Sequence, residues 1–142
     1  MYGTREDIPL DEDRLVELTD TREAPGAVDW TAVDQARGDA NAMIEQPLRD
    51  KYVLPLDPID AIVRVWWRAI VAYLLYRRRE KMPMPATTEA DFKRTIQEIR
   101  RVADGADQLS ARRAGAATPP NVGGGALDDL SPVFGRGRDG LF

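Results

Sequence analysis

The segment from Tyr52 to Arg79, YVLPLDPIDAIVRVWWRAIVAYLLYRRR, decides the fold of this chain. Each proline near its start favours an extended conformation in the residue before it. Asp57 is a good N-cap and Pro58 suits the first helical position, so the spacing predicts a helix from there to about Arg79. Apolar residues then recur at steps of three and four. They form two adjacent rows: Ile59, Ile62, Trp66, Ile70 and Tyr73, and beside them Val63, Trp67, Val71 and Leu74.

A narrow polar strip of Asp60, Arg64 and Arg68 interrupts the apolar surface of this helix. A helix that is apolar around most of its girth must be enclosed, either by the other helices of the chain or by a neighbouring subunit. Adjacent residues on a helix point about 100° apart, so the two tryptophans cannot both face one neighbour. We expect core packing for Trp66. The second row is the candidate subunit interface: Val63, Trp67, Val71 and Leu74.

The residues before this segment predict three more helices. Thr4 can cap a short first helix, and a second is expected from Glu12 to Leu18. A longer helix should begin at Thr31, where Thr31 and Asp34 resemble a capping box. Pro47 should kink this helix or end it just before. Its apolar residues share one face: Val33, Ala36, Ala40, Ile44 and Leu48.

A last helix is predicted after the central segment. Thr88 and Asp91 have the spacing of a helix cap, and Gly105 is placed to close the helix. Its apolar row is Phe92, Ile96, Ile99 and Ala103. The sequence shows no convincing strand pair and no internal repeat. It therefore predicts an all-α fold, a small bundle of four to five helices over residues 1–105, followed by a long extended arm over residues 106–142.

Composition limits the chemistry that the chain can carry. Its 142 residues suit one domain, and a net charge of -4 gives no overall attraction to nucleic acid. The absence of cysteine and histidine excludes disulfides and thiol nucleophiles, and it removes the commonest metal ligands and the usual general base. The acidic run 11–13 lacks the glycine and the glutamate of a calcium loop. We therefore expect no enzyme, no metal site and no cofactor.

Nothing in the sequence predicts a membrane protein. The N-terminus is acidic and lacks the basic start and apolar run of a signal peptide. The most apolar stretch, Ile59 to Tyr76, contains three charged residues that a membrane-spanning helix would not tolerate cheaply. A soluble, cytoplasmic protein without a membrane partner is the expectation.

The C-terminal arm is too poor in apolar residues to hold itself in place. Fixing the backbone of a segment of this length costs on the order of tens of kcal/mol. Burying its large apolar side chains would return about 10–15 kcal/mol in total. The arm therefore needs the surface of a partner to become ordered, with Gly123, Gly124 and Gly125 as the hinge. The residues expected to dock are Leu127, Leu130, Val133, Phe134, Leu141 and Phe142, with Arg136 and Arg138 pairing with carboxylates of the partner.

Several segments resemble a known family. They are MYGTREDI (1–8), ELTD (17–20), DQARGDANAMIE (34–45), and above all YVLPLDP (52–58) with AIVAYLLYRRR (69–79). These segments are similar to the Mu-like phage neck proteins, the head–tail connector (adaptor) family of tailed phages and prophages. The resemblance covers about residues 1–105. Pro47 and the long, glycine-rich arm depart from the family pattern.

The resemblance implies an α-helical virion protein at the head–tail junction, made in the cytoplasm of the host bacterium. Such a protein forms a homo-oligomeric ring beneath the portal, with twelve copies set by the portal, and extends the channel for passing double-stranded DNA without sequence-specific binding. The ring also presents a platform to the next neck or tail protein. The arm, residues 106–142, would dock on the portal protein.

Two other functions remain open from the sequence. The first is a stopper or tail-completion protein of the same neck, one layer farther from the capsid. The second is a small helical nucleic-acid-binding regulator that uses Arg77, Arg78 and Arg79 together with the arginines of the arm. Basic residues at the end of a helix are also what the helix dipole favours, so the three arginines do not by themselves indicate nucleic-acid binding.

Overall fold

The computed structural model describes residues 1–114, and this part of the chain is a helical bundle. Its elements are the 3-10 helix η1 (Arg5–Asp7) and the α-helices α1 (Glu12–Thr19), α2 (Trp30–Leu48), α3 (Ala61–Arg77) and α4 (Ala86–Ala103). The all-α bundle predicted from the sequence is confirmed, and the predictions for η1 and α1 are confirmed almost to the residue. The predicted arm lies outside the described residues, apart from its first nine.

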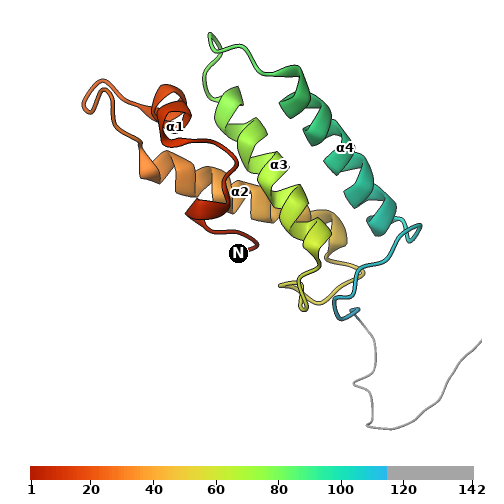
Figure 1. The fold of residues 1–142 in the computed structure, drawn as a ribbon. Helices are drawn as coiled ribbons and strands as arrows, with labels where there is room; N and C mark the ends of the chain where they lie inside the picture. Colours follow the sequence, from red (N-terminus) through yellow and green to blue (C-terminus); the bar gives the residue numbers. More distant parts are fainter. Residues whose placement is uncertain (115–142) are drawn as a thin grey trace, which may run out of the picture. The chain divides into compact units, whose positions relative to one another are not determined.

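Helix α3 is the centre of the bundle and contacts each of the other three α-helices. In Figure 1, α2 crosses behind it and α4 returns alongside it. The buried residues of α3 are Val63, Trp66, Trp67, Ile70, Val71, Ala72, Leu75 and Tyr76. The predicted apolar face of α2 is confirmed, because all five of its residues are buried. Two of them are alanines, which allow α2 and α3 to approach closely.

The seam between α3 and α4 contains an aromatic stack and a polar bond. The rings of Tyr73 and Phe92 lie parallel with their centroids 3.7 Å apart. The indole Nε1 of Trp66 donates a hydrogen bond to Glu98 Oε1 at 2.9 Å. Ile99 is buried, and Phe92 and Ala103 pack against the core, so three of the four residues in the predicted apolar row of α4 face the core.

The predicted start of α3 is wrong. Asp57 and Pro58 do not begin the helix, which starts at Ala61. The reason is a contact from a distant part of the chain. The carbonyl of Asp57 accepts a hydrogen bond from the Arg112 N–H at 3.1 Å, and the Asp60 carboxylate accepts one from the Ser110 N–H at 2.8 Å. These bonds hold the residues before α3 outside the helix.

Two details of α2 also differ from the prediction. The N-cap is Asp29, whose carboxylate accepts from the N–H groups of Thr31 and Ala32, so Thr31 is already helical. Pro47 lies inside the last turn, and the helix continues to Leu48. A proline this close to the end removes one hydrogen bond without ending the helix before it.

The ends of α4 follow the prediction in part. The helix begins at Ala86, directly after Pro85, and the predicted cap at Thr88 is wrong. Asp91 instead accepts a hydrogen bond from Arg94 at 2.8 Å. Gly105 ends the helix as predicted, with the positive φ of 86° that glycine adopts most readily.

The compact unit extends from Met1 to Arg112, beyond the boundary expected after residue 105. The Leu109 N–H donates to the Tyr52 hydroxyl at 2.9 Å, and the Val53 N–H donates to the Arg112 carbonyl at 2.8 Å. Ala111 is buried between these contacts. The first residues assigned to the arm are therefore part of the folded unit.

The N-terminal residues close the core over α3. Tyr2 is buried, and its hydroxyl donates to Glu45 at 2.6 Å while accepting from the Leu56 N–H at 2.8 Å. Burial and the bond to the Glu45 carboxylate raise the pKa of this phenol. Gly3 lies directly against the indole of Trp67. A Cβ atom at Gly3 would stand 2.4 Å from two carbons of that ring.

Replacing Gly3 with alanine should therefore destabilise the bundle. The added methyl group overlaps a buried ring, and we expect the free energy of unfolding to fall by about 1–3 kcal/mol in urea titrations followed by circular dichroism. Gly38→Ala is the matched control. A Cβ atom at Gly38 meets nothing within 4 Å, so this change in α2 should add roughly 0.5–1 kcal/mol. Equal stabilities for Gly3→Ala and the unaltered chain would contradict this packing.

Candidate functional site

The predicted subunit interface lies mainly inside the bundle. Val63, Trp67 and Val71 are 1%, 0% and 0% exposed, and Leu74 is partly buried against the same core. They pack together as the spacing indicated, but the chain itself covers them, in part through Tyr2 and Gly3. A contact between subunits through α3 would have to use other residues of this helix.

Ile62 and Val65 are the large apolar residues that α3 leaves exposed, each at 39%. They are three positions apart, so they lie on one face of the helix. Ile62 belongs to the same predicted apolar row as Trp66, whereas Val65 belongs to neither predicted row. The available signal was the position of Val65 between Arg64 and Arg68 on the polar side of the helix.

Two hollows adjoin this exposed pair along the seam between α3 and α4. One has a volume of about 300 Å³, and its lining includes Leu10, Val65, Arg68 and Arg94. The other has a volume of about 500 Å³, and its lining includes Ile62, Trp66, Glu98 and Leu109. Each residue of the apolar pair therefore lines one hollow, and exposed apolar residues of this kind can mark a surface that binds a partner.

Arg64 and Arg68 make the same side of α3 positive. Both contribute to lowering the pKa of Asp7, although hydrogen bonds from the backbone N–H and the hydroxyl of Thr4 are the larger causes. Neither arginine forms an ion pair within residues 1–114. The exposed face of α3 thus combines two apolar side chains with two positive charges.

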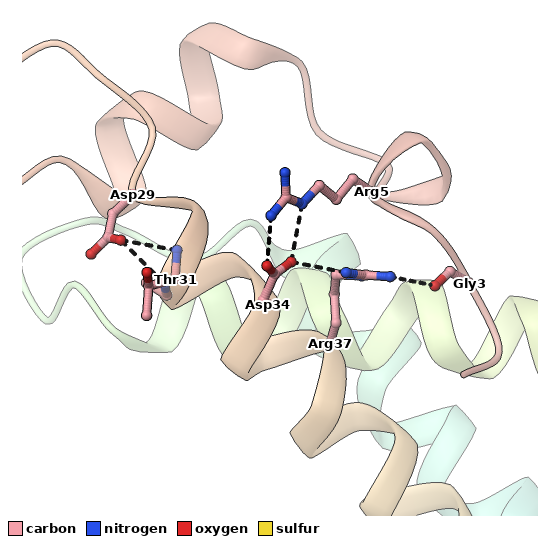
Figure 2. Close-up of polar contacts among 7 residues, drawn as sticks. Gly3, Arg5, Asp29, Thr31, Asp34 and Arg37 are labelled. Atoms are coloured by element: carbon pink, nitrogen blue, oxygen red, sulfur yellow. Dashed lines mark hydrogen bonds and ion pairs between the residues drawn. The ribbon is translucent and has the colours of Figure 1, made fainter.

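A polar cluster of Arg5, Asp34 and Arg37 fastens the N-terminal segment to α2, as Figure 2 shows. Arg5 binds the Asp34 carboxylate with two hydrogen bonds, at 3.1 and 2.6 Å. Arg37 binds the same carboxylate at 2.8 Å and donates to the Gly3 carbonyl at 3.1 Å. The bonds from Arg5, and then those from Arg37, lower the pKa of Asp34 to about 2. This cluster holds Gly3 in place over Trp67, which is a structural role.

The three arginines at the end of α3, Arg77, Arg78 and Arg79, do not all have the same role. Arg79 donates to the Leu18 carbonyl at 3.1 Å, to the Asp20 carboxylate at 2.8 Å and to the Asp20 carbonyl. It therefore ties the end of α3 to the end of α1. Arg77 and Arg78 are exposed. Of the three arginines proposed to bind nucleic acid, only Arg77 and Arg78 therefore remain without a hydrogen bond to the end of α1 in the described chain.

The described residues contain few other candidates for a site. Among residues 1–114 there is no group of three or more histidine, cysteine or acidic residues that could hold a metal ion. No helix in this part of the chain is long and apolar enough to cross a membrane. The predicted hinge and docking residues lie outside the described part: Gly123, Gly124, Gly125, Leu127, Leu130, Val133, Phe134, Arg136, Arg138, Leu141 and Phe142.

Comparison with known proteins gives a family. Residues 2–126 match the model of the family described as Bacteriophage Mu, Gp36. The chain belongs to this family. It is also 28% identical over 128 residues to gene product J of Escherichia phage Mu, an alignment that covers 90% of this chain and 88% of that protein. The Mu-like character expected from the sequence is thus confirmed. The family match includes the compact unit from Tyr2 onward and the first residues beyond it.

Removing the negative charge of Asp34 should reveal how much the cluster of Arg5, Asp34 and Arg37 contributes to the stability of the fold. Asp34 is about half exposed, so Asp34→Asn should lower the free energy of unfolding by about 0.5–1 kcal/mol at pH 7. A carboxylate with a depressed pKa stabilises the fold above its ordinary pKa of 3.8, and this contribution is lost as the pH falls towards 2.

The measurement is a series of denaturant titrations between pH 7 and pH 2. The difference between the two proteins should shrink below about pH 4 and be largely lost as the pH falls to about 2. Asp39→Asn is the control, because Asp39 is exposed and has no ion pair in the described chain. A difference that persists unchanged at pH 2 would show that Asp34 acts in another way.

Proposed function

We propose that this Mu-like phage protein is a structural head–tail connector, an adaptor that forms a ring beneath the portal, extends the DNA channel and joins the capsid to the tail. Membership of the Bacteriophage Mu, Gp36 family carries the proposal, because the match runs through the whole helical unit into the arm. The resemblance of residues 1–105 to the neck proteins supplies the more specific role. The proposal assigns the chain no catalysis and no cofactor.

The path of the chain after α4 supports an anchoring role for the arm. Hydrogen bonds from Leu109, Ser110 and Arg112 fix the chain beside the residues that precede α3. The remaining arm therefore starts from a defined point of the bundle. Its apolar residues are too few for a core of their own, and in this proposal they become buried on the portal, where Arg136 and Arg138 pair with carboxylates.

The net charge of -4 supports the proposed channel. Double-stranded DNA must pass through the ring without being held, and an acidic protein does not attract a polyanion as a whole. In this proposal twelve copies follow the symmetry of the portal, and the opposite side of the ring receives the next neck or tail protein. A stopper one layer farther out would bind tail subunits with its arm instead.

Deleting the residues after Asn121 should separate folding from docking. Circular dichroism of the truncated chain should retain its helical signal, because the compact unit ends at Arg112. Co-sedimentation with purified portal rings should be lost. A full-length variant in which serine replaces Leu127, Leu130, Val133 and Phe134 should likewise keep its helical signal and lose portal binding. The matched control, Asp128→Asn with Asp129→Asn, keeps the apolar residues and should still bind.

Retained portal binding by the truncated chain would contradict the proposed role of the arm. Binding of the full-length chain to tail subunits, with none to portal rings, would identify a stopper. Gel shifts at low ionic strength test the nucleic-acid alternative, whose affinity should fall steeply with salt.

A further inference from the structure

We propose that neighbouring copies associate by packing the exposed face of α3 of one copy against the outer face of α2 of the next. This inference rests on the proposed ring and names the surfaces that would build it. The α3 face is defined by Ile62, Val65, Arg64 and Arg68, and the α2 face by Gly38, Asp39 and Ala42.

The α3 face offers large apolar side chains that project from the bundle. Ile62 and Val65 lie on one face of the helix and are among the few large apolar residues that the described chain leaves exposed. Ala69, half-buried, continues their row. Val65 lines the smaller of the two hollows and Ile62 lines the larger one. Such a surface gains most by packing against a helix with small side chains.

The outer face of α2 has the opposite shape. A Cβ atom at Gly38 would meet no other atom within 4 Å, so the space above this residue is open. Ala42 follows one turn later and is exposed. The two residues lie on the side of α2 away from its buried row, which contains Ala36, Ala40 and Ile44. Because both residues are small, they form a strip of α2 on which the side chains of Ile62 and Val65 can pack closely.

The two faces point away from each other on one molecule. The buried row of α3 packs on the buried row of α2, so the exposed face of each helix is directed away from the other helix. One copy therefore cannot bring its two faces together. Contact between unlike faces of successive copies is heterologous, and repetition of such a contact closes into a ring when the rotation allows.

The charges on the two faces also favour the unlike pairing. Arg64 and Arg68 flank the apolar pair on α3, and the exposed carboxylate of Asp39 adjoins Gly38 on α2. None of the three has an ion pair within residues 1–114. Contact between the faces places opposite charges together. A two-fold pairing of two α3 faces would instead oppose the arginines of both copies.

Cysteine pairs test this contact directly, because the natural chain contains no cysteine. The full-length variant with Val65→Cys and Ala42→Cys should form disulfides between copies on oxidation, both at high concentration and in assembled particles. A heterologous contact gives a ladder of dimers, trimers and longer chains on a non-reducing gel. A two-fold contact stops at dimers. Each single variant, and the pair Lys93→Cys with Ala42→Cys, should give no ladder.

A second variant keeps the test independent of folding. Gly38→Gln fills the strip on α2 but replaces a helical glycine that has open space around it, so the thermal midpoint should stay the same or rise. Added to the cysteine pair, it should reduce the yield of the ladder about tenfold. A ladder of unchanged yield in this variant, with an unchanged midpoint, would overturn the contact, because the strip on α2 would then be filled without effect.

The outcomes separate the contact from the proposed function. Incorporation of the cysteine-pair variant into the neck without a ladder would overturn the proposed contact and leave the connector role standing. Cross-linking of Val65→Cys to a different particle protein would also overturn it, because another partner would then occupy the α3 face. Absence of the chain from particles would overturn the connector role, and the ladder of the purified chain would then decide the contact alone.

Discussion

Closure of the N-terminal residues over the central helix is the constraint on which the rest of the structure depends. Gly3 lies against the ring of Trp67 at a distance that leaves no room for a Cβ atom. Tyr2 and Arg5 hold it there through bonds to two positions of α2, Glu45 and Asp34. Because this closure buries one row of α3, the helix is left with a different and smaller exposed face. The surfaces available for assembly follow from it.

Much of the fold could be predicted from the local sequence. Helix α1 and the buried face of α2 follow from capping residues and from apolar spacing, and both depend only on neighbouring residues. The start of α3 could not be predicted in this way. Asp57 and Pro58 favour a helix start, but hydrogen bonds from Ser110 and Arg112 hold the chain in another conformation. Local preference was overcome by contacts between residues far apart in the sequence.

The candidate site was harder to predict for the same reason. Spacing shows that Val63, Trp67 and Val71 share a row, but it does not show what covers the row. The cover includes Tyr2 and Gly3, which are far from this row in the sequence but pack in the same core. Ile62 belonged to a predicted apolar row and Val65 to neither row, but the two residues are equally exposed. The family could be recognised from short segments of sequence, whereas the exposed face of α3 could be identified only from the folded structure.

Location in the assembled particle tests the central claim most directly. Cryo-electron microscopy of intact phage particles, reconstructed around the head–tail junction, measures where the helical unit lies. The connector proposal predicts a ring of copies directly beneath the portal, each with its C-terminal arm against the portal protein. A junction without this four-helix unit, or the unit found in the capsid shell or at the far end of the tail, would contradict the proposal.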